Sequence, residues 1–203
     1  MISINHIKKA VLLAVIACTA AVSFGASPVD MTIDENLACP AVSGKASSPI
    51  IRHMEKLGAV LTRHSFKVTP MRRGEVLRVS VPCSYLFDPN SEDLRTGAAR
   101  YLQAFRDVAR LPGQYKILVV VHTDDSGSDT YLEELSSARA NAIDEYYAET
   151  LGNSGLNIIP YGVGNDEPLQ PNTSIGNRAA NRRVDFYLVP EQGLIDQARS
   201  GKL

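Results

Sequence analysis

Two side chains of opposite charge, Asp124 and Arg139, carry the strongest chemical signal in this sequence. Arg139 falls within a stripe of apolar residues that recur at helical spacing. The stripe comprises Leu132, Leu135, Ala142, Ile143 and Tyr146. A guanidinium in such a stripe must reach solvent or meet an acceptor, because an unpaired buried charge is very costly. Asp124, which closely follows an apolar segment, is the acid best placed to meet it.

These two charges permit two interpretations. A carboxylate and a guanidinium that open on one crevice can hold a zwitterion, with Asp124 binding an ammonium group and Arg139 binding a carboxylate. The same residues can instead form a structural ion pair that ties a loop to a helix, and spacing alone favours this second interpretation. His122 and Asp124 have the H-x-D spacing of metal ligands, but no second histidine lies at ligand spacing. We therefore predict a hydrogen-bonded turn histidine and no metal site.

The surrounding residues predict the elements that position these charges. Residues 116–121 are apolar almost throughout, which is typical of a strand covered on both faces. The polar turn 122–127 follows, and then Thr130 and Glu133 predict the capping box of a helix that ends near Gly152. Ligands of α/β layers commonly bind between the end of a strand and the helix after it. Both charged side chains are expected at such a crevice.

The remaining periodicity predicts an α/β (α+β) sandwich with helices on one face of the sheet. The other predicted elements are a helix from Ser48-Pro49, a hairpin with strands 66–69 and 76–81, a helix capped by Ser91 and stopped at Pro112, a strand at 156–161, a long polar segment at 162–181, a strand at 182–189 and a tail helix at 191–203. From the second hairpin strand onward the order is β-α-β-α-β-(α)-β. This order predicts a four-stranded sheet preceded by an additional helix and strand.

The first 26 residues have the pattern of an export signal. Lys8 and Lys9 precede the apolar run 10–24, and small residues follow it, so we predict a signal peptide over residues 1–26. Alternatively, residues 15–18 resemble a bacterial lipobox, in which Cys18 would be lipidated and become the first residue. The sequence favours neither interpretation.

Either cut leaves two cysteines with unmodified thiols, Cys39 and Cys83. In an oxidising compartment this pair predicts a disulfide between the N-terminal extension and the first core strand, and two unpaired thiols are the alternative. The remaining chain divides into a tether or irregular arm (27–47), a helix and strand extension (48–74), a core domain (75–190) and a C-terminal tail (191–203).

Composition restricts the class of protein. The 203 residues suit one domain with extensions, and 44% hydrophobic and 21% charged residues are typical of a globular chain. A formal net charge of -1 provides no basic surface, so nucleic acid is not an expected partner. No internal apolar run is long enough to cross a bilayer.

Five short segments resemble the OmpA-like peptidoglycan-binding domain family. They are Phe-Asp-Pro-Asn at 87–90, His-Thr-Asp-Asp-Ser-Gly at 122–127, Leu-Ser-Ser-Ala-Arg-Ala at 135–140, Tyr-Gly-Val-Gly at 161–164, and Arg178 with Asn-Arg-Arg-Val at 181–184. They occur in the order and at the spacing of the family, across roughly residues 75–190. The resemblance implies the family's fold, with helices packed on a four-stranded mixed sheet.

The resemblance also implies a ligand and its contacts. The family binds meso-diaminopimelate of the peptidoglycan stem peptide, whose ammonium is held by the aspartate of the HTD turn and whose carboxylate is held by the arginine of the LSxxRA motif. These positions are Asp124 and Arg139 here. The other family positions near the ligand correspond to Asn90, Thr123, and Arg182 or Arg183.

Two residues depart from the family pattern. Leu132 stands where the family usually has an asparagine that contacts the ligand, and Val121 replaces the usual glycine. The loss of an amide donor removes one polar contact, worth about 1 kcal/mol net. Affinity or specificity is therefore expected to differ from the family's usual pattern.

These observations predict a non-catalytic, cofactor-free module that binds peptidoglycan at the periplasmic face of a Gram-negative outer membrane. A lipid anchor or a protein partner would connect it to that membrane. The alternative is a structural or interaction protein that kept the fold and lost wall binding, and Leu132 motivates it. A wall-modifying hydrolase with Asp124 or Asp125 as general base is a third interpretation, but the sequence shows no positioned acid partner.

Overall fold

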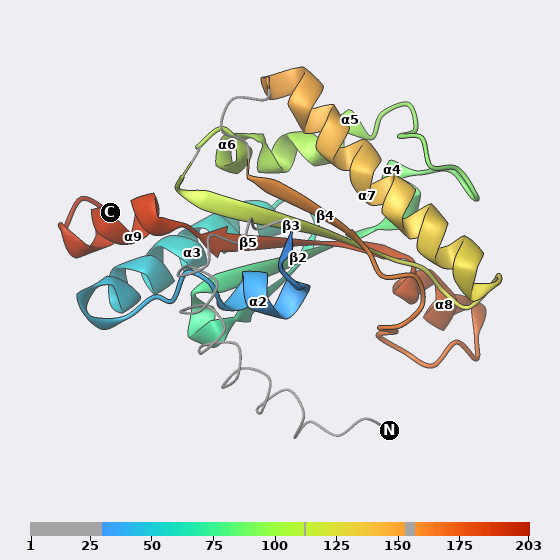
Figure 1. The fold of residues 1–203 in the computed structure, drawn as a ribbon, viewed down its shortest axis with the longest axis horizontal. Helices are drawn as coiled ribbons and strands as arrows, with labels where there is room; N and C mark the ends of the chain where they lie inside the picture. The colour runs from blue at the N-terminus through green and yellow to red at the C-terminus, as the bar shows by residue number, and fades with distance from the viewer. Residues whose placement is uncertain (1–29, 112, 153–156) are drawn as a thin grey trace.

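The computed structural model describes residues 30–111, 113–152 and 157–203, which form a five-stranded sheet with a layer of helices on one face (Figure 1). The strands are β1 (Lys67–Met71), β2 (Val76–Pro82), β3 (Tyr115–His122), β4 (Ile158–Gly162) and β5 (Arg183–Pro190). Their order in the sheet is β1-β2-β5-β3-β4. β3 and β4 are parallel and every other neighbouring pair is antiparallel. The predicted mixed α/β (α+β) sandwich is confirmed, with β1 as the additional strand.

The helical layer buries the main hydrophobic core against the sheet. Its elements are α3 (Ser47–Thr62), α4 (Cys83–Leu86), α5 (Ala99–Leu102), the 3-10 turn η4 (Gln103–Phe105), α6 (Arg106–Ala109), α7 (Asp129–Leu151) and α9 (Gln192–Arg199). The rings of Phe105 and Phe186 stack at 4.1 Å between this layer and β5. α3 and α9 cover one end of the sheet, and α7 runs along β3 and β4 (Figure 1). Another short helix, α8 (Ile175–Asn181), precedes β5.

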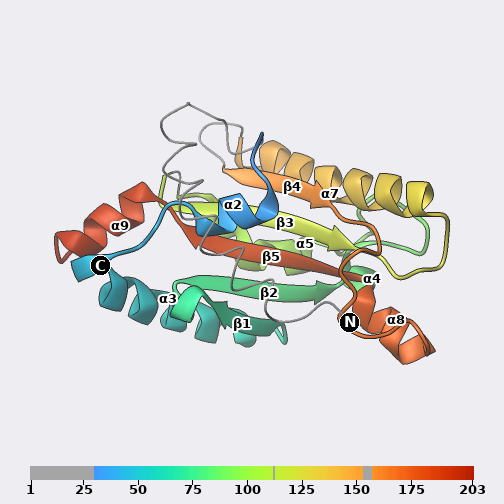
Figure 2. The ribbon, with the colours of Figure 1, turned by 60° about the horizontal axis from the view of Figure 1, so that its bottom comes forward.

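The opposite face of the sheet is covered by α2 (Ile33–Ala38), within the segment predicted to be an irregular arm (Figure 2). Thr32 and Glu35 form a capping box that starts this helix. Ile33 and Leu37 pack against the apolar side chains of this face, which come from β2, β3, β4 and β5. The arm is therefore partly helical and docked on the sheet.

Two predicted helix starts are wrong. Ser91 does not cap a helix, because its hydroxyl accepts a hydrogen bond from the Asp93 N–H at 3.1 Å within a loop that continues to residue 98. The N-cap of α7 lies two residues before Thr130, because the Ser128 hydroxyl accepts the Tyr131 N–H at 3.3 Å and the helix begins at Asp129. In both cases a nearby serine hydroxyl decides where the chain turns.

The predicted disulfide between Cys39 and Cys83 is also wrong, because Cys83 is a free, buried thiol. Its sulfur lies 3.8 Å from the carbonyl oxygen of His122, at the last residue of β3. Cys39 lies beside the start of β3, where its carbonyl accepts the Lys116 ammonium at 2.8 Å. The strand between these points extends about 20 Å, whereas bonded cysteines have Cα atoms within about 7 Å.

The predicted signal peptide over residues 1–26 and the predicted lipidation of Cys18 lie outside the described residues. Within the described part of the chain, no helix combines the length and the apolar content needed to cross a bilayer.

Candidate functional site

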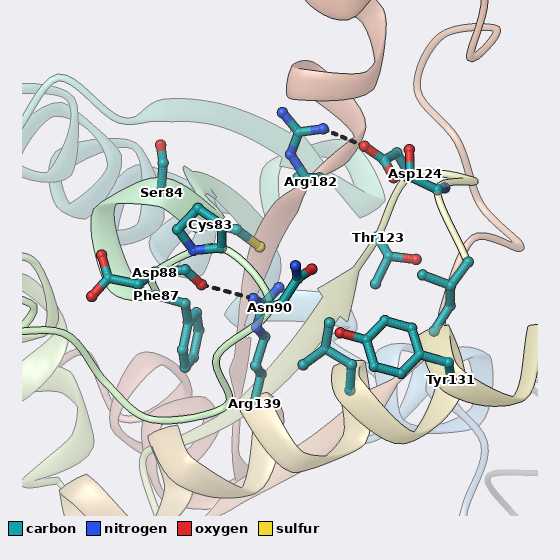
Figure 3. A pocket seen from close by; sticks show the side chains of 14 residues that line it. Cys83, Ser84, Phe87, Asp88, Asn90, Thr123, Asp124, Tyr131, Arg139 and Arg182 are labelled. Carbon is teal, nitrogen blue, oxygen red and sulfur yellow. Dashed lines mark hydrogen bonds and ion pairs between the residues drawn. The ribbon is translucent and has the colours of Figure 1, made fainter. Parts of the chain in front are cut away.

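A pocket of about 300 Å³ opens at the end of β3, between α4, the loop that follows it, and the first turns of α7 (Figure 3). Five of the six residues predicted for ligand binding by family correspondence line it, and Arg182 is the one of the two alternative arginines that does. The complete lining is Cys83, Ser84, Phe87, Asp88, Pro89, Asn90, Thr123, Asp124, Ser126, Tyr131, Leu132, Leu135, Arg139 and Arg182. The fold thus brings together segments that are up to 99 positions apart, from Cys83 to Arg182.

Asp124 lies in the turn after β3, and its carboxylate is almost fully buried. One carboxylate oxygen, Oδ1, accepts the Ser126 N–H at 2.9 Å, and the other, Oδ2, contacts the Arg182 guanidinium. Burial opposes ionisation of this acid, but the Ser126 hydrogen bond and the Arg182 charge outweigh it and lower the Asp124 pKa. The side chain is therefore a carboxylate at neutral pH.

Arg139 is buried in α7, with 5% of its surface exposed, as its position in the apolar stripe predicts. Its guanidinium donates through Nε to the Ser91 carbonyl at 2.7 Å and through Nη2 to the Asp88 carbonyl at 3.2 Å. The Phe87 ring centroid lies 5.0 Å from its central carbon, in a cation–π contact. Burial lowers the pKa of Arg139 from its ordinary value.

The structural ion pair between Asp124 and Arg139 is not formed. Asp124 pairs with Arg182, whereas Arg139 meets no carboxylate within the described parts of the chain. A guanidinium has five N–H donors, so Arg139 keeps donors that are free to face the pocket. Figure 3 shows Asp124 and Arg139 on different sides of this pocket.

Thr123 lines the same pocket and carries an unsatisfied polar atom. Its hydroxyl oxygen is buried and has no hydrogen-bond partner among the described residues. Its backbone is held in place, because its N–H donates to the Gly164 carbonyl at 2.8 Å. The Gly164 N–H in turn donates to the Ser136 hydroxyl of α7 at 2.9 Å. A buried hydroxyl without a partner is costly unless a ligand or water satisfies it.

Asn90 lies in the loop that supports Arg139 and has φ +57°. This left-handed conformation is accessible to asparagine at lower cost than to most residues. It lies between Asp88 and Ser91, the two residues whose carbonyls accept from Arg139. Asn90 therefore lines the pocket and shapes the loop that orients the guanidinium.

The pocket also has an apolar wall that sequence reasoning only partly identified. Leu132 and Leu135 of α7 lie beside Tyr131, whose side chain is partly exposed. The sequence identifies Leu132 as a departure from the family pattern, but it does not predict that Tyr131 and Cys83 line the site. No local signal marks Cys83, because its contact with β3 joins residues that are 39 positions apart in the sequence.

Arg182 or Arg183 was expected near the ligand, and Arg183 does not line the pocket. The alternative that places Arg183 at the ligand is therefore corrected. The Arg183 guanidinium donates to the Asp185 carboxylate at 3.0 Å and to the Glu167 carbonyl at 3.2 Å. The reason is strand geometry: Arg183 starts β5, where successive side chains point to opposite faces. Arg182 precedes the strand and faces the pocket.

His122 is buried in the sheet and is not the turn residue that we predicted. Its Nε2 lies 3.3 Å from Oδ2 of Asp185, on the face of the sheet that carries Arg183. Burial opposes ionisation of Asp185, but the contacts with His122, Arg183 and Ser80 lower its pKa. This group supports the sheet behind the pocket. Across the described residues, no three His, Cys, Asp or Glu side chains converge in a way that could hold a metal ion.

Residues 86–182 match the family model described as "OmpA family". Outer membrane porin F of Pseudomonas aeruginosa is 29% identical over 117 residues, which cover 58% of this chain and 33% of that protein. The outer-membrane lipoprotein YfiB of Pseudomonas aeruginosa is 34% identical over 105 residues, which cover 51% of this chain and 57% of that protein. The chain therefore spans between about a third and about three fifths of the length of these relatives.

A solved structure of similar fold is that of a putative MotB-like protein from Desulfovibrio vulgaris. It superimposes with a TM-score of 0.59 at 28% sequence identity, covering 72% of this chain and 93% of that chain. The superimposed share of this chain is therefore larger than residues 86–182.

Proposed function

We propose that the protein binds peptidoglycan without catalysis, from the premise that residues 86–182 match the model of the OmpA family. The proposed ligand is the diaminopimelate residue of the stem peptide, held in the pocket between Asp124 and Arg139. Binding of this kind would anchor an envelope component to the cell wall. The names of the two curated relatives, an outer membrane porin and an outer-membrane lipoprotein, support a place at the periplasmic face of the outer membrane.

The observation that carries the proposal is the buried Arg139 guanidinium. It faces the pocket without a carboxylate partner from the described residues, and Thr123 adds a buried hydroxyl without a partner. A buried cation and an unsatisfied hydroxyl are both costly unless a ligand satisfies them. A carboxylate is the ligand group that a guanidinium fork binds best.

The arrangement fits the free end of a diaminopimelate side chain, which carries an ammonium and a carboxylate on one carbon. The carboxylate would accept hydrogen bonds from the free N–H groups of Arg139 and from the Thr123 hydroxyl. The ammonium would lie at the Asp124 carboxylate, which is ionised at neutral pH because its pKa is lowered. The methylene groups would pack on Leu132 and Leu135, where the pocket is apolar.

The proposal is tested by co-sedimentation of the protein with purified sacculi. We expect Asp124→Ala and Arg139→Ala each to weaken retention by about tenfold to a hundredfold, because each removes a charge-assisted contact. Asp125→Ala is the matched control: it removes the same charge from the next residue, which is exposed and does not line the pocket. Equal retention of the wild type and both site variants, with unchanged melting temperatures, would reject the proposal.

A second candidate is a structural or interaction protein that keeps this fold without binding the wall. Two observations favour it: Leu132 is apolar, and Asp124 is already paired with Arg182. Calorimetry with a diaminopimelate-containing muropeptide separates the two candidates. Measurable binding that Arg139→Ala abolishes excludes the second candidate, whereas absence of binding supports it.

A further inference from the structure

We infer that Arg182 makes the pocket select a ligand that carries a second carboxylate. The ligand class is then a stem peptide that ends at diaminopimelate, in preference to one that continues beyond it. This inference rests on the proposed function and concerns the same pocket. It follows from the contacts of Arg182 and from the charges that the pocket holds.

Arg182 has a fixed backbone and a side chain that is free to exchange partners. It is the C-cap of α8, where its N–H donates to Arg178 at 3.1 Å, and its carbonyl accepts the Cys83 N–H at 3.0 Å. The side chain is 44% exposed, and its guanidinium contacts Asp124 (Figure 3). An ion pair with one exposed partner is weak, so a ligand can compete for it.

The ligand ammonium and Arg182 require the same carboxylate. Oδ1 of Asp124 already accepts the Ser126 N–H, and Oδ2 contacts Arg182. An ammonium that approaches Asp124 must therefore share Oδ2 or displace the guanidinium. In either case the ion pair between Arg182 and Asp124 is weakened, and N–H donors of the Arg182 guanidinium become available to the ligand.

The charges at the pocket sum to +1 without the ligand. Asp124 contributes -1, and Arg139 and Arg182 contribute +1 each. Asp88 also lines the pocket, but its carboxylate is largely exposed and pairs with Arg95 at 3.5 Å. Figure 3 shows this carboxylate directed away from the other charged groups, while the Asp88 carbonyl faces Arg139.

A ligand with one ammonium and two carboxylates balances this charge. The ammonium would pair with Asp124, one carboxylate with Arg139 and the other with Arg182. A diaminopimelate residue at the end of a stem peptide has this set of groups, because its second carboxylate is free. In a longer stem the second carboxylate is part of a neutral amide, so the diaminopimelate residue would offer Arg182 no carboxylate.

The test compares two synthetic tripeptides that end in diaminopimelate, one with the second carboxylate free and one with that carboxylate converted to a primary amide. Calorimetry on the full chain should show the free acid binding roughly fivefold to tenfold tighter, as expected for a partly exposed ion pair. Arg182→Gln should bring the two affinities to within about twofold, and Arg182→Lys should keep part of the difference. Arg95→Gln is the control, because it removes a cation from the rim and should leave the ratio unchanged.

The outcomes separate this inference from the proposed function. Equal affinity of the wild type for both tripeptides overturns the inference and leaves the proposed function standing. No binding of either tripeptide overturns both. A ratio that persists in a folded Arg182→Gln protein, or one that Arg95→Gln abolishes, overturns the assignment to Arg182. If Arg182→Gln does not fold, the two tripeptides are compared on Arg182→Lys at low and high salt. Salt screens an exposed ion pair, so the ratio of the two affinities should fall at high salt. A ratio that does not fall overturns the assignment to Arg182.

Discussion

At the scale of single residues, the site is defined by how each charge is satisfied. Arg139 is a buried cation supported by two backbone carbonyls and an aromatic ring, which leaves donors for a ligand. Asp124 is a buried anion supported by a backbone N–H and the partly exposed Arg182. The two residues therefore differ. Arg139 has no carboxylate partner among the described residues, whereas Asp124 is paired with an arginine that a ligand can displace.

The lowered pKa of Asp124 predicts how its contribution to stability depends on pH. The folded state prefers the carboxylate, so the contribution is fully present above the pKa of the unfolded acid and is lost as pH falls through the lowered folded pKa. Urea unfolding of wild type and Asp124→Asn should differ by about 1 kcal/mol at neutral pH, since Arg182 is partly exposed. That difference should shrink towards about pH 3. A difference that is constant or grows in acid would contradict the interpretation.

At the scale of elements, the pocket depends on the close packing of α7 against β4. A Cβ at Gly162 would lie 2.2 Å from the backbone nitrogen of Ser137, so only glycine allows the helix this close to the strand. The same approach lets Ser136 bind the Gly164 N–H, and the Gly164 carbonyl then holds Thr123. The Gly-Val-Gly and Leu-Ser segments thus position the turn that carries Asp124.

Gly162→Ala should therefore destabilise the protein by about 1–3 kcal/mol, because it forces backbone atoms apart in a packed interface. The measurement is the midpoint of urea unfolding at constant slope. Gly176→Ala is the control: its nearest contact is the Ser174 hydroxyl at 4.0 Å, and alanine favours the helix that contains it. Equal midpoints for Gly162→Ala and wild type would show that α7 moves away from β4 without cost.

At the scale of the whole molecule, the sheet separates the pocket from a docked N-terminal arm. The buried Lys116 ammonium donates at 2.8 Å to both Asn36 Oδ1 and the Cys39 carbonyl, and Arg72 donates to the Leu37 carbonyl at 2.6 Å. These contacts lie near the start of β3, whereas the pocket lies at its end. The arm is therefore held at a distance from the ligand-binding groups, and changes in its docking should leave ligand affinity unchanged.

Burial lowers the pKa of Lys116 to about 8. Between this value and the ordinary lysine pKa of about 10.4, the unfolded chain binds one more proton than the folded protein at this site. The free energy of unfolding of wild type relative to Lys116→Met should therefore rise with pH across this window and be flat below it. Equilibrium unfolding at a series of pH values measures this difference. A difference that is constant or falls with rising pH across this window would contradict the lowered pKa of Lys116.

Local periodicity was sufficient for much of the architecture. The apolar run of β3, the helical stripe of α7 and the alternation along β5 each predict an element within a few residues of its observed bounds. The stripe also predicts that Arg139 is buried. The alternation of side chains along β5 indicates that Arg183 and Arg182 point in different directions. These features depend on spacing along the chain, which sequence reports directly.

The sequence by itself determined the fold class and which segments meet at the end of β3. Only the tertiary structure decided the partners: Arg182 pairs with Asp124, the carbonyls of Asp88 and Ser91 support Arg139, and Cys83 lines the pocket as a free thiol. The physical reason is the range of each interaction. A helix or strand is set by neighbours a few residues away, whereas an ion pair or a disulfide between distant segments depends on sheet register and on the face that each side chain takes.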